Sequence, residues 1–84
     1  MISWSDFEKV DMRVGVVKRS SAQITHRYRL VDLVGRQVVC VVNFPAKQVG
    51  PFVSEVLVMG AYAKSHEVVL LRPDEPVPPG SKIG

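Results

Sequence analysis

The segment Gln37-Val38-Val39-Cys40-Val41-Val42-Asn43-Phe44 carries the clearest strand signal in this chain of 84 residues. Residues 38–42 are apolar at every position, as in a strand that is buried on both of its faces. Pro45 ends the strand because proline has no backbone N–H to donate to a neighbouring strand. The segment is therefore predicted to be a central strand of a sheet.

Strand signals recur on both sides of this segment. Further strands are predicted at residues 12–17, 20–25, 53–61 and 67–71, with a brief edge strand at residues 81–84. Gly15, within the first of them, marks a bulge or a sharp coil of the kind that small barrels need. Residues 46–51 are predicted to form a loop, and the proline-rich residues 73–80 cannot form a helix or an interior strand. Many short strands separated by turn signals predict an all-β fold, a small barrel.

Helix is predicted in two short places only. The first is at the N-terminus, where Ser5 with Glu8 fits a capping box, or Ser3 provides the N-cap instead. The second is a helical turn within residues 26–34, which Gly35 ends. Such short helices can flank a barrel but cannot form its core.

The size and composition predict one ordered domain over residues 1–84. Hydrophobic residues make up 46% of the chain and charged residues 23%, which is typical of a globular protein. No run of about 18 apolar residues occurs, so no membrane insertion is expected. The N-terminus lacks the basic start and the apolar run of a signal peptide. The single cysteine, Cys40, excludes an internal disulfide and suits a reducing cytosol, so a cytoplasmic location is predicted.

The charge balance is mildly basic, with a formal net charge of +3 and a pI of about 9.4. A charge of this size permits weak attraction to nucleic acid or to an acidic protein and demonstrates neither. Five basic residues are clustered in the sequence, opposed only by Asp32: Lys18, Arg19, Arg27, Arg29 and Arg36. Such a cluster is either a solvated face or a surface that faces a partner.

No catalytic or metal-binding constellation is convincing. His26 and His66 are far apart in the sequence, and neither has a cysteine or an acidic residue at the spacing of metal ligands. Cys40 lies in the most apolar strand, which favours a buried, inert thiol. There is no glycine motif of the kind that cradles phosphates. We therefore expect a protein that is not an enzyme and that uses no cofactor and no metal.

Polar residues inside strand-like sequence suggest a binding surface. Ser21 and Gln23 share one face of their predicted strand, and Gln23 offers both a donor and an acceptor to a peptide backbone. Ser54 and Glu55 face opposite sides by alternation, and a carboxylate in a sheet is costly unless it is solvated or paired. Glu55 would repel phosphate but could accept a hydrogen bond from a peptide N–H or an arginine, which favours a polypeptide ligand.

Residues that follow the central strand extend this surface. The amide of Asn43 either fixes a turn or binds a ligand backbone, and Lys47 is either an ordinary exposed lysine or a contact for phosphate or an acidic partner. Tyr28 and Phe52 would stack bases, hold apolar side chains of an unfolded protein, or fill the barrel ends. The predicted ligand-binding groove consists of Ser21, Gln23, Asn43, Lys47, Ser54 and Glu55. Further basic and aromatic contacts are predicted at Arg19, Arg27, Tyr28, Arg29, Arg36 and Phe52.

The chain resembles a known family over nearly its whole length. It begins with Asp6-Phe7-Glu8-Lys9-Val10-Asp11-Met12-Arg13-Val14-Gly15, which is similar to the opening DF…DxRVG of the tRNA-binding domain family. Two stretches are more selective, because they resemble the CsaA secretion chaperone branch with its pattern SSAQIT…SEVLVLG. They are Ser20-Ser21-Ala22-Gln23-Ile24-Thr25 and Ser54-Glu55-Val56-Leu57-Val58-Met59-Gly60. The tRNA-binding branch prefers SGI and SEGM at these places.

The resemblance implies an OB-fold barrel, with short flanking helices, that works as a homodimer. Trp4, Phe7 and the proline-rich tail offer apolar surface for such a twofold contact. CsaA-like proteins are implicated in protein export, where they bind unfolded or precursor polypeptides and the SecA motor. The expected function is therefore that of a CsaA-like export chaperone, and the alternative is a structure-specific tRNA-binding protein.

One departure from the family pattern lies between Val17 and Lys18. In the family a loop and a strand separate the RVG strand from the SSAQIT strand, whereas here Val17 runs directly into Lys18. A piece of about 20 residues, the size of one strand and a long loop, is missing. Either the deletion is real and the barrel is open, or the sequence omits a segment of the protein; we expect the second.

Overall fold

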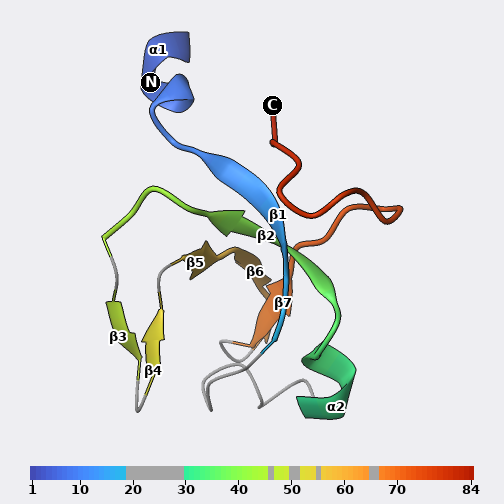
Figure 1. The fold of residues 1–84 in the computed structure, drawn as a ribbon. Coiled ribbons are helices and arrows are strands. Elements are labelled where there is room, and N and C mark those ends of the chain that lie inside the picture. The colour runs from blue at the N-terminus through green and yellow to red at the C-terminus, as the bar shows by residue number, and fades with distance from the viewer. Residues whose placement is uncertain (19–29, 46, 50–51, 55, 65–66) are drawn as a thin grey trace.

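The computed structural model describes residues 1–18, 30–45, 47–49, 52–54, 56–64 and 67–84 (Figure 1). Strands make up most of the regular structure, and the helices are short. The elements in chain order are α1 (Trp4–Glu8), β1 (Met12–Val16), α2 (Leu30–Leu33), β2 (Gln37–Val41), β3 (Lys47–Val49), β4 (Phe52–Ser54), β5 (Leu57–Val58), β6 (Gly60–Tyr62) and β7 (Val68–Leu70). The predicted all-β class with short flanking helices is confirmed, and the part of the chain that is described contains no helix long enough and apolar enough to cross a membrane.

The central sheet has the order β1-β2-β5, and both pairings are antiparallel. Strand β2 lies in the middle, as its uninterrupted apolar sequence predicts. Its side chains Val38, Cys40 and Val41 are buried, which accounts for apolar residues on both faces. The β1–β2 register runs without a break through Gly15, which lies opposite Val38. The bulge expected at Gly15 is therefore absent from this pair.

A bent segment joins this sheet to the sheet formed by β6 and β7. Strand β5 pairs with β2, and after Met59 the chain turns so that β6 pairs with β7. Three backbone hydrogen bonds connect the sheets at this point. The Met59 N–H donates to the Val39 oxygen (2.9 Å), the Leu71 N–H to the Met59 oxygen (3.2 Å), and the Val39 N–H to the Leu71 oxygen (3.0 Å). We call this set of bonds the Val39–Met59–Leu71 junction.

The strand boundaries differ from the prediction in the middle of the chain. The single strand expected over residues 53–61 is divided among β4, β5 and β6, because each part pairs with a different neighbour. The loop expected over residues 46–51 contains β3, which forms an antiparallel hairpin with β4. The strand predicted at residues 20–25 lies outside the described residues. Among the described residues, pairing gives three sheets and does not close a barrel.

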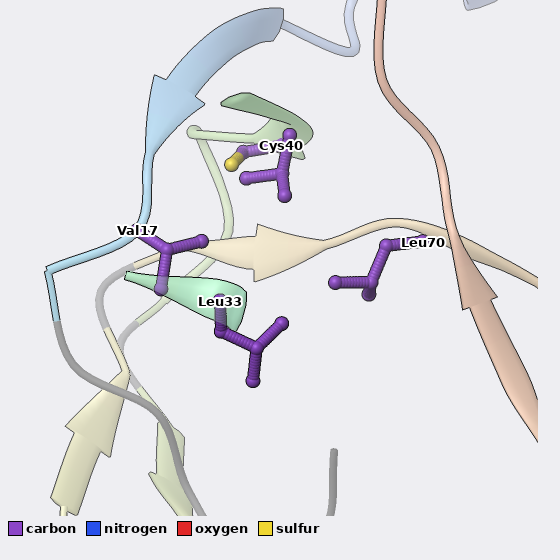
Figure 2. Close-up of a cluster of buried hydrophobic side chains, with 5 residues drawn as sticks. Val17, Leu33, Cys40 and Leu70 are labelled. Carbon is purple, nitrogen blue, oxygen red and sulfur yellow. The ribbon is translucent and has the colours of Figure 1, made fainter. Parts of the chain in front are cut away.

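The core lies between the central sheet, α2 and β7. Its buried side chains form one cluster, which consists of Val17, Leu33, Val38, Cys40 and Leu70. Leu33 is completely buried, and Figure 2 shows it below Val17 with Leu70 to its side. A helix of one turn has little stability of its own, so burial of Leu33 is the described side-chain contact that anchors α2 to the sheets.

The C-terminal tail returns along the edge of β1 that faces away from β2. The Val14 N–H donates to the Ser81 oxygen (2.9 Å), and the Gly80 N–H donates to the Val14 oxygen (2.7 Å). Farther back, the side-chain amide of Gln37 imitates a strand neighbour for Val77. It donates to the Val77 oxygen (2.6 Å) and accepts from the Val77 N–H (3.1 Å). The brief edge strand predicted at residues 81–84 is present as one bridge to β1.

The N-terminal helix α1 projects from the body of the protein (Figure 1). Ser3 is its N-cap, and the Asp6 carboxylate accepts a hydrogen bond from the Ser3 N–H (3.1 Å), so the Ser3 alternative is confirmed over Ser5. These bonds hold the pKa of Asp6 below its ordinary value, the backbone bond from Ser3 being the largest cause. The rings of Trp4 and Phe7 lie 5.4 Å apart, and 69% of Trp4 is exposed.

Candidate ligand-binding surface

An apolar cavity of about 480 Å³ opens beside β1, between β2, β5 and β7. We call it the β1 hollow. Its apolar lining includes side chains that also belong to the core or pack against it: Val17, Val38, Cys40, Val42, Val56, Val58 and Leu70. None of the described residues that line it is acidic or aromatic. The hollow is thus an exposed extension of the hydrophobic core.

Gly15 leaves room in the floor of the β1 hollow. It lies opposite Val38 on β2, so a side chain at this position would share a face with Val38 and Cys40. A Cβ atom at Gly15 would lie 3.3 Å from the Cys40 sulfur, tighter than an ordinary contact. Burial raises the pKa of the Cys40 thiol, while a backbone hydrogen bond from Gly15 opposes the shift. The buried thiol agrees with the inert character that the sequence predicts.

Two cationic side chains flank the β1 hollow. The Arg13 Nε donates to the Asp11 Oδ1 (2.7 Å), and its Nη1 donates to the Gly80 oxygen (3.3 Å). These contacts hold Arg13 between β1 and the C-terminal tail. Lys18 follows β1 at the opposite end and is exposed. Among the described lining residues, the rim of the hollow therefore carries positive charge and no carboxylate.

The backbone of β1 is left unpaired at one position beside the hollow. Because hydrogen bonding alternates along an antiparallel strand, the polar groups of Val14 and Val16 point away from β2. The C-terminal tail satisfies Val14. No described residue bonds to the backbone N–H or C=O of Val16, and 39% of Val16 is exposed. Among the described residues, this part of β1 has no strand neighbour on the side away from β2.

The side-chain amide of Asn43 hydrogen-bonds the backbone of the segment between α1 and β1. Its Nδ2 donates to the Lys9 oxygen (2.6 Å), and its Oδ1 accepts from the Asp11 N–H (3.0 Å). The amide thereby holds the connection between α1 and β1 against the end of β2. Of the two roles that the sequence left open for Asn43, these bonds correspond to the structural one, although the backbone held is distant in sequence. A ligand contact at Asn43 stays a prediction.

The other predicted site residues are only partly placed. Lys47 and Ser54 lie opposite each other in the β3–β4 hairpin, and Phe52 begins β4 opposite Val49. Arg36 connects α2 to β2, where its N–H donates to the Leu33 oxygen (3.0 Å). The remaining predicted contacts lie outside the described residues: Ser21, Gln23, Glu55, Arg19, Arg27, Tyr28 and Arg29.

The β1 hollow itself was not anticipated from the sequence. Its polar rim comes from Arg13 and Lys18, of which Arg13 was seen only as part of a family motif. The available signal was Gly15 in a run of valines, since a glycine in a strand also marks a site where another chain approaches closely. No group of three or more histidine, cysteine or acidic residues that could hold a metal ion occurs within the described part of the chain.

Comparison with known families gives one match that covers most of the chain. The profile described as "Putative tRNA binding domain" matches residues 6–82. Two curated relatives are methionine–tRNA ligases, from Nanoarchaeum equitans (30% identical) and Parabacteroides distasonis (27% identical). The alignments cover 99% and 98% of this chain but only 14% and 16% of the two enzymes, so the chain spans a small fraction of their length. The first runs over 106 positions, more than the 84 residues of this chain, so that enzyme has residues here that this chain lacks.

Solved structures show the same architecture. The chaperone CsaA of Bacillus anthracis is 41% identical with a TM-score of 0.90, and the match covers 100% of this chain and 99% of that one. The CsaA chaperone protein of Picrophilus torridus is 38% identical with a TM-score of 0.84, and both chains are covered completely. A protein of Pyrococcus horikoshii related to methionyl-tRNA synthetase has a TM-score of 0.81 at 20% identity, with 100% and 98% of the chains covered, which is a likeness of fold alone.

Proposed function

Since this chain belongs to the tRNA-binding domain family, in its CsaA branch, we propose that it is a CsaA-like chaperone of protein export. In this proposal it is a non-catalytic OB-fold domain, located in the cytoplasm, that binds unfolded or precursor polypeptides and has the SecA motor as a further partner. The domain comprises residues 1–84, and in this proposal the segment missing between Val17 and Lys18 is omitted from the sequence and is not a true deletion. That the alignment with the Nanoarchaeum equitans relative has more positions than this sequence has residues supports a missing segment.

The observation that carries the proposal is the apolar lining of the β1 hollow. Apolar side chains of an unfolded polypeptide gain free energy when they leave water for such a surface, at about 25 cal/mol per Å². Binding of single-stranded nucleic acid usually uses aromatic side chains for base stacking, and the described lining has none. The chemistry of the hollow thus suits a polypeptide better than an exposed base.

The alternative function, binding of structured tRNA, rests on charge. Lys18 is exposed at the rim of the hollow and begins the basic cluster predicted from the sequence. Two curated relatives are tRNA ligases, in which this domain is a small part of the enzyme. A basic surface that contacts phosphates could act together with, or instead of, the apolar hollow.

A salt titration separates the two functions. Binding of bulk tRNA through several phosphates would fall on the order of 10³-fold between roughly 50 and 200 mM salt, because counterions are released on binding. Binding of a reduced, carboxymethylated polypeptide through apolar contacts is expected to change little over the same range. Fluorescence anisotropy of each labelled ligand with the same protein preparation measures both. Tight, salt-sensitive tRNA binding without any polypeptide binding would reject the chaperone proposal.

The proposal includes a homodimer that uses α1. No residue of α1 is buried, and Ile2 and Trp4 are each 69% exposed, so this end of the protein presents apolar surface to the solvent. Light scattering at micromolar concentration is expected to give twice the mass of one chain. Trp4→Ala is expected to shift the mass toward the monomer, because a large aromatic anchor is lost. A monomeric unsubstituted protein would contradict the dimer.

A further inference from the structure

We propose that the side-chain amide of Asn43 is a positioning group for α1. It fixes the direction in which α1 leaves β1, and it thereby holds Trp4 ready for contact with a second copy of the chain. This inference rests on the homodimer of the proposed function and deepens it, because it names the residue that prepares the contact surface.

Helix α1 depends on its surroundings for its direction. It has five residues, and none of them is buried. A helix this short is unstable in isolation, because nucleation is unfavourable and few hydrogen bonds follow it. The capping box of Ser3 and Asp6 closes its first turn, yet bonds within a helix cannot fix where the helix points. The direction of α1 is therefore set by the segment that joins it to β1.

Asn43 holds this joining segment at two points. Lys9 is the C-cap of α1, and its backbone oxygen accepts from the Asn43 Nδ2 (2.6 Å). The last carbonyl groups of a helix have no partner within it, so this bond satisfies one of them. The Asp11 N–H donates to the Asn43 Oδ1 (3.0 Å), and the Asp11 oxygen accepts from the Val42 N–H (2.8 Å). One amide thus joins the end of α1 and the start of β1 to the residues that follow β2.

This arrangement lies at one end of the β1–β2 pair. The pair runs from Met12 opposite Val41, next to Asn43, to Val16 opposite Gln37 at the other end. Figure 1 shows α1 beyond the Met12 end of β1. The segment that the sequence lacks joins the chain at the other end, and both partners of each Asn43 bond are described residues. The positioning of α1 therefore does not depend on that segment.

A second copy of the chain suits the surface that α1 presents. Trp4 is 69% exposed, and its ring lies 5.4 Å from that of Phe7, so two aromatic rings form one apolar surface. Asp6 and Lys9 of the same helix form an exposed ion pair. A helix that carries both signs of charge is complementary to its own copy across a twofold axis, where each charge can face its opposite.

The amide contributes to dimer affinity through order. A flexible element must be immobilised before two copies can meet, and preorganisation removes that cost. Loss of one exposed hydrogen bond corresponds to a factor of roughly three, and a twofold dimer contains two copies of α1. Asn43→Ala is therefore expected to raise the dissociation constant of the dimer by roughly tenfold.

Analytical ultracentrifugation of the full chain measures this constant. Gln37→Ala is the matched control, because the Gln37 amide also makes two bonds to a distant backbone, at Val77 (2.6 and 3.1 Å). Urea denaturation should show that Gln37→Ala loses at least as much stability, since its bonds are partly buried. Only Asn43→Ala should weaken the dimer. Equal weakening by both variants would overturn the positioning role, because lost stability or the C-terminal tail would then explain it.

Amide hydrogen exchange measured by NMR tests the same residue locally. The Asp11 N–H is bound by the Asn43 oxygen, so Asn43→Ala should speed its exchange and that of residues 3–10, while β1 and β2 keep their protection. Asn43→Asp keeps an acceptor for Asp11 but removes the donor to Lys9. It should therefore leave Asp11 protected and still weaken the dimer.

The outcomes separate this inference from the proposed function. If the unsubstituted protein is a monomer, the homodimer is wrong and the inference falls with it. If it is a dimer whose dissociation constant and hydrogen exchange are unchanged by Asn43→Ala, the inference is wrong and the homodimer survives. If Asn43→Ala leaves the dimer intact but weakens binding of the reduced, carboxymethylated polypeptide, Asn43 is a ligand contact and the positioning role is rejected.

Discussion

Replacement of Leu33 by alanine is expected to lower the free energy of unfolding by about 2–5 kcal/mol. Leu33 has 0% exposure, and it joins α2 to the cluster formed by Val17, Val38, Cys40 and Leu70 (Figure 2). Its truncation removes apolar contacts and leaves a cavity that so short a helix cannot fill by shifting as a unit. A chain of this size has a total stability of about 4–13 kcal/mol. The substitution therefore removes a large part of it.

Urea denaturation followed by circular dichroism measures this change. The matched control is Val34→Ala, because Val34 follows Leu33 directly and is 53% exposed. A substitution at an exposed position is expected to alter the stability by no more than about 0.5 kcal/mol. Equal effects of the two substitutions would show that α2 is not packed against the sheets as described.

The second large effect is expected at Gly60, where β6 approaches β7. A Cβ atom added here would clash with the Cγ1 of Val68 and would lie 3.0 Å from the backbone oxygen of Val69. Neither neighbour moves easily, because valine is stiff about χ1 and the oxygen belongs to the β7 backbone. Although Gly60 is exposed, the added methyl group meets β7 at too short a distance, so Gly60→Ala is expected to cost about 1–3 kcal/mol of stability, the cost of overpacking.

A double substitution shows whether the close approach is the cause. Val68→Ala removes the Cγ1 atom, so it should relieve part of the cost of Gly60→Ala while it costs stability in the unsubstituted protein. The two changes should be non-additive by more than about 0.5 kcal/mol in a double-mutant cycle measured by denaturation. Additive changes would indicate that Gly60 matters for another reason, such as its backbone conformation.

The sequence predicted a strand best where an uninterrupted apolar pattern matches a position in the middle of a sheet. Residues 38–42 are apolar without interruption, and β2 is the middle strand of its sheet. Strands β1 and β7 were also predicted near their observed positions. The division of residues 53–61 among several strands could not be read from local pattern, because it depends on which distant strand each part meets. The β3 strand was not predicted because Gly50 and Pro51, which directly follow it in the sequence, are typical of loops.

The side-chain hydrogen bonds of Asn43 and Gln37 also join residues that are far apart in the sequence. Asn43 bonds Lys9 and Asp11, which are 34 and 32 positions away, and Gln37 bonds Val77 across 40 positions. Sequence reasoning recognised that Asn43 could fix a turn but not which backbone it would hold. Strand alternation pointed to ligand contacts such as Glu55, whereas the β1 hollow appears only when strands from both halves of the chain are assembled.

The Val39–Met59–Leu71 junction has a consequence for how the protein opens. Its three hydrogen bonds form a closed cycle, so each segment donates to one partner and accepts from the other. Separation of any one segment breaks two of the three bonds, so two N–H groups and two C=O groups lose their hydrogen-bond partners. Stepwise fraying is thereby disfavoured, so we expect the strands on either side of the bend to open together, with their amide hydrogens exchanging at similar rates.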